Sequence, residues 1–477
     1  MTDQAQKRTL AVHETPIPGL LAIDLPVPGD NRGWFKENWQ RAKMTAAGLP
    51  DFGPVQNNIS FNQAEGVTRG IHAEPWDKYI SVATGAVFGA WVDLREGPSF
   101  GTAYWHEITP ETAIFVPRGV GNAFQTISAP AAYTYLVNDH WSEGAQAQYT
   151  FLNLADETVA IPWPIPLEQA ELSAKDVAHP RLADVTPVPP RRTLVVGANG
   201  QLGRALAARW AERADVDLVA RDRLDLADAA SVEAFDFTPY GTIVNAAAYT
   251  AVDTAETPEG RAQAWAVNVD GVARLVERAR AQRATLVHVS SDYVYDGTAA
   301  QHTEDEPVSP LGVYGQTKAA GDRIVATLPD HYILRTSWVV GEGGNFVRTM
   351  ASLAERGIDP SVVDDQTGRL TFTSDLAAAI EHLLTVRPAP GVYHLSCSGE
   401  PLSWADVAKA VFALRGHDPA RVTPVTTADY YAGQDRAEGD GTIAPRPRGS
   451  VLDLAKIEAT GFTARDQDEA LREYLEG

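Results

Sequence analysis

The feature that most constrains the fold is a change of pattern at residues 179–190. This stretch, HPRLADVTPVPP, holds four prolines and no aromatic residue. Because proline interrupts both helices and central strands, the stretch predicts a semi-rigid linker between folded domains. Seven of the 11 tryptophans lie before residue 170, whereas a single lysine, Lys318, lies between Lys175 and Lys409. We therefore expect one domain over residues 1–178 and a second over residues 191–477.

The charge and the cysteine content argue against several classes of protein. The chain has 40 Lys and Arg against 62 Asp and Glu, a net charge of −22. Such an acidic chain argues against nucleic acid or an anionic membrane as the main partner. The one cysteine, Cys397, excludes an internal disulfide and argues against a zinc cluster of cysteines and histidines. The first 19 residues lack the apolar core of a signal peptide, and no window is apolar enough to span a membrane, so we expect a cytoplasmic protein.

The first half has the pattern of an all-β domain. Short runs such as AVFGAWVDLR, TAIFVPRG and AYTYLVNDHW are rich in Val, Thr and aromatic residues and are separated by Gly and Pro turns. This spacing favours a sandwich or a barrel. The pattern Gly66-x5-His72-x-Glu74, followed by Pro117-x-Gly119-x-x-Asn122, is similar to the two motifs of a cupin barrel. A metal-binding cupin has histidines where Glu74 and Asn122 stand, so we expect no metal centre and a base-catalysed reaction instead.

One histidine of this half stands among polar groups that suit an anionic ligand. A lone histidine is more often structural than catalytic, but His72 lies in GVTRGIHAEPW, three residues after Arg69. The segments RGWFKE (32–37) and QNN (56–58) add further polar side chains. Together these groups predict a pocket for a nucleotide sugar.

Residues 8–175 resemble the dTDP-4-dehydrorhamnose 3,5-epimerase family in NRGWFKENW, VQNNIS, GVTRGIH, VDLR, VPRGVGNAF and DETVAIPWP. The resemblance implies a cupin or jelly-roll barrel that needs no cofactor and forms at least a homodimer. It implies His72 as the base, oriented by Asp156, and Tyr135 as the acid. It implies that six residues hold the nucleotide and phosphates: Arg32, Glu37, Gln56, Asn58, Arg69 and Lys78. Asn122 is a further expected substrate contact.

The first half departs from this family at several positions. Gly89 replaces an acidic residue, Asn122 replaces a histidine, and the pair after His72 is Ala73-Glu74 rather than aromatic-Gln. These changes leave open whether epimerisation covers both C3 and C5 of the sugar.

The second half alternates strands and helices. RTLVVGANG, GTIVNAAA, TLVHVSS and HYILRTSWVV are buried-type strands with helix-period segments between them, which indicates a doubly wound Rossmann sheet. Gly197, Gly200 and Gly203 follow the first strand in a GxxGxxG spacing that suits a dinucleotide pyrophosphate at a helix N-terminus. Arg221 ends the second strand, where a basic residue pairs with the 2′-phosphate of NADP. An ordinary solvated arginine is an equally good interpretation.

A tyrosine and the isolated lysine form a YxxxK pair. Tyr314 and Lys318 share one face of a predicted helix because they are four residues apart. An ammonium beside the phenol lowers the tyrosine pKa and lets it exchange a proton with a carbinol oxygen. Ser291, at the end of the strand TLVHVSS, is placed to hydrogen-bond a substrate carbonyl. This trio predicts reductase chemistry.

Residues 191–475 resemble the dTDP-4-dehydrorhamnose reductase family, a branch of the short-chain dehydrogenases with a small substrate-binding subdomain. The matching segments are GANGQLG, VNAAAYTAVDTAE, VHVSSDYVYDG, YGQTK, RTSWVV, DDQTG and RPRGSVLD. The resemblance implies Ser291, Tyr314 and Lys318 in catalysis, and Asp292 and Trp338 at the sugar nucleotide. It implies contacts with NADPH or NADH from Gly200, Gln201, Leu202, Asp225, Leu226, Ala247, Ala248 and Tyr249. Two departures are Ser291 for the family's threonine and GRLT at 368–371 for GxPT.

Together the halves predict a bifunctional enzyme of dTDP-L-rhamnose synthesis that epimerises a 4-ketosugar and then reduces it. The alternative is an active reductase whose first half is a nucleotide-sugar binding module or a 5-epimerase for another deoxysugar. The sequence leaves open NADH against NADPH, Mg²⁺ dependence, the oligomeric state and channelling between the sites.

Overall fold

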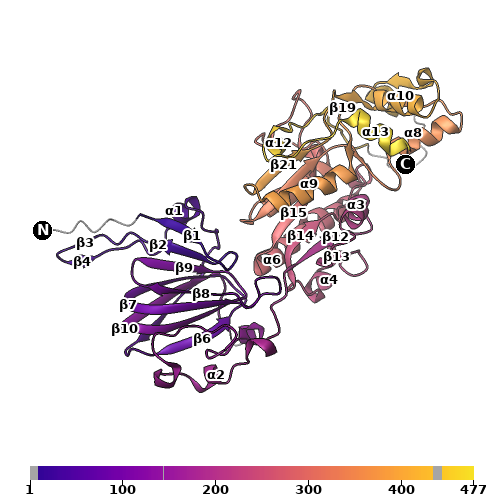
Figure 1. Ribbon diagram of the computed structural model, residues 1–477. Helices are drawn as coiled ribbons and strands as arrows, with labels where there is room; N and C mark the ends of the chain where they lie inside the picture. The colour runs from indigo at the N-terminus through magenta and orange to yellow at the C-terminus, as the bar shows by residue number, and fades with distance from the viewer. Residues whose placement is uncertain (1–8, 143, 433–442, 477) are drawn as a thin grey trace. The chain divides into compact units, whose positions relative to one another are not determined.

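The computed structural model describes residues 9–142, 144–432 and 443–476. Its contacts divide the chain into two compact units, residues 1–190 and 191–477 (Figure 1). Residues 1–8, part of the N-terminal stretch considered above, lie outside the described residues. Among the helices in the described ranges, none is both long and apolar enough to cross a membrane.

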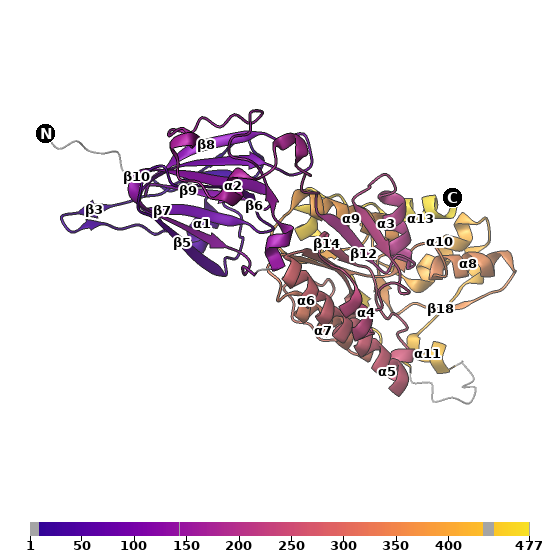
Figure 2. The same cartoon turned by 90° about the horizontal axis from the view of Figure 1, so that it is seen from below.

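The first unit is an all-β barrel of the cupin type, as predicted. Its nine-stranded sheet runs β1-β2-β9-β7-β10-β6-β11, with β5 paired to β10 and β8 paired to β7. The strands are β1 (Ala11–Glu14), β2 (Leu21–Asp24), β5 (Gln56–Asn62), β6 (Thr68–Ala73), β7 (Lys78–Asp93), β8 (Ala103–Ile108), β9 (Thr112–Val116), β10 (Val120–Val137) and β11 (Thr150–Phe151). The hairpin β3 (Gly29–Asp30) and β4 (Gly33–Trp34) extends away from the barrel (Figures 1 and 2).

Two long strands shape this barrel. β7 and β10 pair along most of their length, and β-bulges near Thr126, Ser128 and Ala132 shift their register. Bulges bend a strand and increase its twist, so each strand serves both faces of the barrel. The buried side chains between the faces include Ile80, Trp91 and Phe124.

Short helices close the first unit. They are α1 (Arg41–Ala46), η1 (Gly144–Gln148), η2 (Leu167–Gln169), α2 (Ala174–Val177) and η3 (Leu182–Asp184). The proline-rich stretch is not a free spacer over most of its length. Leu182 and Val185 are buried in a core cluster of the barrel, and the backbone of Val188 bonds to Leu94 and Glu96. This packing holds residues 182–188 to the first unit.

The second unit is built on a parallel six-stranded sheet in the order β13-β12-β14-β15-β16-β21, the predicted Rossmann arrangement. The strands are β12 (Arg192–Val196), β13 (Val216–Val219), β14 (Tyr240–Asn245), β15 (Thr285–Ser291), β16 (His331–Thr336) and β21 (Gly391–Leu395). Buried-type runs of Val, Leu and Ile form these strands because both faces of the sheet are covered. Leu194 packs into one core cluster and the adjacent Val195 into another, as strand alternation requires.

Helices cover both faces of this sheet (Figures 1 and 2). One core contains residues of α4, α6 and α7, and the other contains residues of α3, α9 and α12. The helices are α3 (Gln201–Arg209), α4 (Ala229–Ala234), η4 (Thr254–Glu256), α5 (Pro258–Trp265), η5 (Ala266–Gly271), α6 (Val272–Gln282), η6 (Asp292–Val294), α7 (Val313–Val325), α9 (Thr373–Val386) and α12 (Ala455–Glu458). The segment η5 is a π-helical turn between α5 and α6.

A smaller group of elements forms the expected subdomain around its own core cluster. Its strands are β17 (Val339–Val340), β18 (Ser361–Val363), β19 (Thr367–Gly368), β20 (Thr371–Phe372), β22 (Leu402–Ser403), β23 (Thr423–Val425) and β24 (Gly449–Ser450). Its helices are α8 (Phe346–Glu355), α10 (Trp404–Leu414), η7 (Pro419–Arg421), α11 (Thr427–Ala432) and α13 (Gln467–Glu476). Ser403 and Asp406 form a capping box that fixes the start of α10.

Candidate active sites

A cavity of about 830 Å³ opens in the barrel of the first unit. Strands β6 and β10 and the helix α2 supply much of its wall. His72 and Tyr135 both line it, so the predicted base and the predicted acid face one common space. Other charged and polar residues of the wall include Arg69, Glu74, Lys78, Asn122, Glu171, Lys175, Asp176 and His179.

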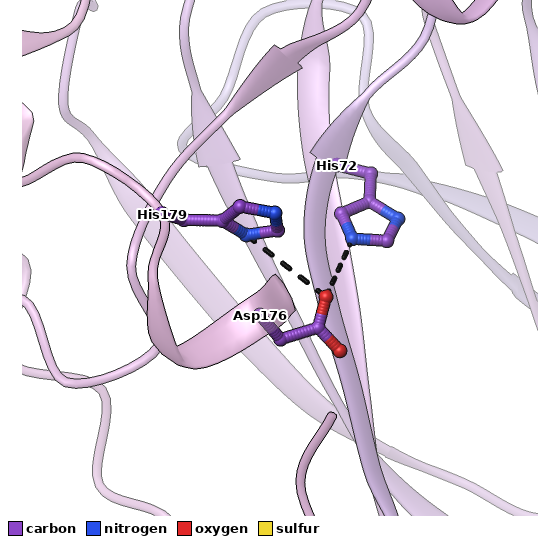
Figure 3. A group of neighbouring side chains, drawn as sticks. All are labelled: His72, Asp176 and His179. Atoms are coloured by element: carbon purple, nitrogen blue, oxygen red, sulfur yellow. Dashed lines mark hydrogen bonds and ion pairs between the residues drawn. The ribbon is translucent and has the colours of Figure 1, made fainter. Parts of the chain in front are cut away.

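His72 is held by a carboxylate that the sequence did not indicate. Its Nε2 lies 2.9 Å from Oδ1 of Asp176, which is buried in α2 (Figure 3). Burial acts to raise the pKa of the Asp176 carboxyl, but the hydrogen bonds to His72 and Ser173 outweigh it, and the pKa is lowered. The pair leaves Nδ1 of His72 as the nitrogen that is free to act as a base.

The predicted role of Asp156 is wrong in this structure. Its Oδ1 accepts hydrogen bonds from the backbone N–H groups of Thr158 and Val159, and its Oδ2 accepts one from Leu182. These three donors use both oxygens of a buried carboxylate. Asp156 therefore fastens a turn and the start of η3, whereas Asp176 is the partner of His72.

His179 lies on the other side of Asp176. Its Nδ1 is 4.0 Å from Oδ1 of Asp176, and its ring meets the His72 ring edge to face with 5.3 Å between centroids (Figure 3). The ring also stacks on Phe151, with centroids 4.6 Å apart. Burial, followed by the nearby His72, lowers the pKa of His179.

Tyr135 is suited to donate a proton. Burial and the neighbouring Glu74 raise its pKa, although Arg69 acts in the opposite direction. A raised pKa keeps the proton on the phenol oxygen until a stronger base takes it. The ammonium of Lys78 lies 5.6 Å from the centre of the Tyr135 ring.

The residues that replace cupin metal ligands have other partners. Glu74 forms a 2.5 Å ion pair with Lys78, and both side chains are almost fully buried. Asn122 accepts a hydrogen bond from the hydroxyl of Tyr133. Lys78 and Asn122, both predicted substrate contacts, therefore line the cavity with their side chains partly engaged.

The other predicted nucleotide contacts of the first half are spread over three places. Arg69 lines the main cavity, whereas Gln56 and Asn58 line a neighbouring hollow of about 360 Å³ that Tyr135 also borders. Arg32 is exposed on the β3–β4 hairpin and pairs with Asp30, and Glu37 pairs with Lys43. Arg32 and Glu37 are therefore outside both hollows of this chain.

The glycine turn of the second unit has the geometry of a pyrophosphate cradle. It connects β12 to α3, and Gly200 is the N-cap of that helix. Gly197 has a φ of +90°, and a Cβ there would lie 2.7 Å from the backbone nitrogen of Ala247. A Cβ on Gly203 would lie 2.3 Å from the carbonyl oxygen of Gly197. The turn therefore requires glycine, and this close packing fits the dinucleotide fingerprint.

The remaining predicted cofactor residues surround this turn in different ways. Gln201 donates to the carbonyl of Gly344, and Leu202 packs into the core beside the turn. Arg221 is exposed and forms a 2.9 Å ion pair with Asp225. Leu226 is buried in a core cluster. Ala247 and Ala248 follow β14: the backbone N–H of Ala247 donates to Asn245, and Ala248 is exposed.

The predicted catalytic trio of the second unit lies in a buried site. Ser291 ends β15, and Tyr314 and Lys318 lie one turn apart on α7. Burial raises the pKa of Tyr314 to about 12, although a hydrogen bond with Ser291 opposes this rise. Burial lowers the pKa of Lys318 to about 8, and its ammonium donates to the carbonyl of Val289. The expected lowering of the Tyr314 pKa is therefore wrong, because burial outweighs any stabilisation of the phenolate.

The two predicted sugar-nucleotide contacts of this half are in unusual environments. Asp292 is buried, which raises its pKa to about 6 against the opposing hydrogen bonds of Ser450 and Ser291. Trp338 has a positive φ of 46°, and its ring stacks on Trp404 with 3.8 Å between centroids. Strained backbone held by packing is typical of functional sites.

The comparisons with known proteins divide at the same place as the structure. The family model of the dTDP-4-dehydrorhamnose 3,5-epimerase matches residues 14–184, and that of the RmlD substrate binding domain matches residues 191–477. A "Protein RmlC homolog" of Streptococcus pyogenes is 51% identical over 197 residues, 40% of this chain and 99% of the relative. The chain belongs to both families, one in each half.

Relatives of the reductase-family half cover it almost completely. A dTDP-4-dehydrorhamnose reductase of Aggregatibacter actinomycetemcomitans is 39% identical over 301 residues, 59% of this chain and 97% of the relative. A crystal structure of a dTDP-4-dehydrorhamnose reductase of Clostridium acetobutylicum is 35% identical and covers 60% of this chain and 98% of its own, with a TM-score of 0.54. The corresponding enzyme of Bacillus anthracis, solved in complex with NADP, is 31% identical with the same coverage and TM-score.

Sequence reasoning missed one buried polar residue in each half. In the epimerase-family half, Asp176 lies 104 residues from His72, and its local pattern, Ser173 followed by Asp176, indicates only a helix start. In the reductase-family half, Asn268 in the π-turn η5 bonds both backbone groups of Tyr249 and the hydroxyl of Thr317. An irregular turn of this kind has no clear sequence pattern, although it is often found at functional sites.

Proposed function

We propose that this chain is a bifunctional enzyme that converts dTDP-4-dehydro-6-deoxy-glucose to dTDP-L-rhamnose in two consecutive steps. Membership of the epimerase and reductase families supports dTDP-rhamnose synthesis as the process. The observation that carries the first step is one cavity that contains both a His72–Asp176 pair and the phenol of Tyr135.

In the first step, His72 removes a proton from a ring carbon next to the C4 ketone. The electrons of the broken C–H bond move to the ketone oxygen as an enolate, and the Asp176 carboxylate stabilises the imidazolium that forms. Tyr135 then donates a proton to the opposite face of the carbon. Each positioned acid or base contributes roughly 10²–10⁴-fold to the rate. C3 and C5 both flank the ketone, so the same groups serve both centres.

In the second step, the ketone at C4 is reduced. The glycine turn from Gly197 to Gly203 would hold the pyrophosphate of NADPH. When bound, NADPH supplies the hydride that C4 receives. Tyr314 gives its proton to the C4 oxygen, and Ser291 hydrogen-bonds that oxygen. The raised pKa of Tyr314 suits this direction, because a reductase needs the tyrosine protonated at the start.

We infer that NADPH is the preferred cofactor. The Bacillus anthracis relative was solved with NADP. Arg221 follows the second strand of the sheet, is exposed, and forms an ion pair with Asp225. A guanidinium in that place recognises the 2′-phosphate that distinguishes NADPH from NADH.

We infer that the epimerase half forms a homodimer. The strand β5 bears exposed apolar side chains at Ile59 and Phe61, and the β3–β4 segment exposes Trp34 and Phe35. Burial of these side chains against a second copy is favourable. Arg32 and Glu37, which lie outside the hollows of their own chain, are then available to the site of the partner.

A time course on dTDP-4-dehydro-6-deoxy-glucose in D₂O with NADPH tests the proposal. Wild type is expected to form rhamnose with deuterium at C3 and C5, whereas His72→Ala and Tyr314→Phe both form none. Exchange at the ring carbons survives in Tyr314→Phe and is lost in His72→Ala. Deuterium at C5 alone in wild type would favour the 5-epimerase alternative, and normal exchange in folded His72→Ala would overturn the base assignment.

A further inference from the structure

We propose that His72, Asp176 and His179 form a binding site for a divalent transition-metal ion such as Zn²⁺, and that the bound ion switches the epimerase half off. The binding site is independent of the reaction, but the inhibitory effect rests on the proposed role of His72 as the base. His179 takes no part in the proposed epimerisation, so it provides a way to separate the two.

The three side chains offer the right atoms at nearly the right separation. Nε2 of His72 is 2.9 Å from Oδ1 of Asp176, and Nδ1 of His179 is 4.0 Å from the same oxygen (Figure 3). The ligand atoms all lie within 4.8 Å of one another. Imidazole nitrogen and carboxylate oxygen are preferred zinc ligands, and ligands of a tetrahedral zinc ion lie roughly 3.4 Å apart. Shifts of about half an ångström in these side chains would bring the three atoms to the separations of three ligands in a four-coordinate site.

The state of His179 is a second indication of a cation. Its Nδ1 is buried and has no hydrogen-bond partner within the described residues. Buried polar atoms are rarely left unpaired in folded proteins. Contacts with Phe151 and His72 hold the ring so that this nitrogen faces the carboxylate of Asp176. A cation between a nitrogen lone pair and a carboxylate oxygen would satisfy both.

The site is open on the side of the cavity. His72 is one third exposed and lines the hollow of about 830 Å³, so an ion can enter and a water molecule can complete its coordination. Arg69, Lys78 and Lys175 line the same hollow and oppose a cation. Lys78 is neutralised by its ion pair with Glu74 at 2.5 Å, which reduces this opposition.

Metal binding would prevent His72 from acting as the base. A neutral imidazole that coordinates through Nε2 carries its proton on Nδ1. Nδ1 of His72 is the atom that takes the substrate proton in the proposed mechanism. The ion therefore displaces the proton between His72 and Asp176 and leaves the other nitrogen protonated, so proton abstraction stops until the ion is removed.

The binding test uses the full chain without an affinity tag, titrated with ZnCl₂ by calorimetry and with CoCl₂ by visible absorption. His179→Phe removes the third ligand and keeps an aromatic ring against Phe151. His13→Phe is the matched control, because His13 and Asp24 form a separate pair at 2.8 Å on the surface. Wild type and His13→Phe are expected to bind about one equivalent at this site, and His179→Phe to bind at least about tenfold more weakly. Equal affinity of wild type and His179→Phe would overturn the site.

The inhibition test follows deuterium exchange into the 4-ketosugar without NADPH. At free Zn²⁺ of about ten times its dissociation constant, exchange by wild type is expected to fall roughly tenfold, because activity follows the metal-free fraction. A chelator restores it, while the same concentration should lower exchange by His179→Phe at most about twofold relative to that variant without metal, since its site is then at most half occupied. Full exchange by zinc-saturated wild type would overturn the inhibition. If wild type shows no exchange even without metal, the proposed epimerase function fails, and the titrations still decide the metal site.

Discussion

Replacement of Asp176 by Asn should impair proton abstraction and leave the barrel folded. The amide keeps the size of the side chain and an oxygen that can accept from Nε2 of His72. It removes the negative charge that stabilises the imidazolium formed when His72 takes a proton. The defect should therefore appear in the rate of the epimerase step rather than in the affinity for the nucleotide.

The size of the effect follows from the contact. A hydrogen bond to a charged group is worth about 1.5–3 kcal/mol, and about 1.4 kcal/mol corresponds to a factor of ten in rate. His72 is one third exposed, so solvent screens part of the charge and favours the lower end of this range. We expect exchange to slow by roughly 10- to 100-fold.

Asp156→Asn is the matched control, because both are Asp→Asn changes at buried carboxylates. Asp156 accepts three backbone hydrogen bonds, and an amide can accept at only one of its two positions. The loss should lower the free energy of unfolding by about 1–3 kcal/mol with little change in the exchange rate of the folded chain. The measurements are deuterium incorporation by NMR and thermal unfolding. The rate at which the reductase half reduces the epimerised ketosugar serves as an internal standard for each variant.

The outcome separates two assignments for the partner of His72. Slow exchange in a folded Asp156→Asn chain together with normal exchange in Asp176→Asn would refute the partnership seen in the structure. Equal, small effects of both substitutions would show that the charge of Asp176 contributes nothing to the base.

Three further predictions concern the reductase half. Gly203→Ala places a Cβ 2.3 Å from the carbonyl oxygen of Gly197 and should weaken NADPH binding at least about tenfold in a fluorescence titration. Gly344→Ala is the control, because its Cβ meets nothing within 4 Å, and it should leave NADPH binding unchanged. Arg221→Ala should lower kcat/KM for NADPH about tenfold and leave that for NADH unchanged; equal losses for both would contradict a 2′-phosphate contact. Lys318 has a pKa lowered to about 8, so it is charged below that pH, and kcat should fall as the pH rises through about 8; a constant kcat up to pH 10 would rule out a need for its charge.

The candidate site of the reductase half could be proposed from the sequence because each of its motifs is local. The glycines of the β12–α3 turn are spaced by the turn itself, and each close approach in the structure explains one of them. Tyr314 and Lys318 share a helix face at a spacing that helical geometry fixes. The protonation states of these two side chains were harder to predict, since their burial depends on the strands and helices that pack around α7. The sequence alone predicts the Tyr314–Lys318 pair but not the raised pKa of Tyr314.

The epimerase half was harder because its site is assembled from distant segments. β6 carries His72, β10 carries Tyr135, and α2 carries Asp176, and the three come together only when the barrel closes. The family resemblance implied Asp156 as the partner of His72, and Asp156 is indeed buried. Which of two buried carboxylates faces a histidine depends on backbone donors: three N–H groups engage Asp156, whereas the short helix α2 presents Asp176 to the cavity.

The opposite protonation demands of the two sites bear on the pH at which a single chain can serve both steps. The Asp176 carboxyl has a lowered pKa, so its charge is present above that pKa and is lost only as the pH falls through it. The ammonium of Lys318 is present below about pH 8 and is lost above it. Loss of the Lys318 charge therefore sets an alkaline limit for reduction, whereas the Asp176 carboxylate of the epimerase half stays charged at that pH. Conversion of the starting ketosugar to rhamnose should consequently fall above about pH 8, with 4-ketosugar that has exchanged deuterium accumulating there.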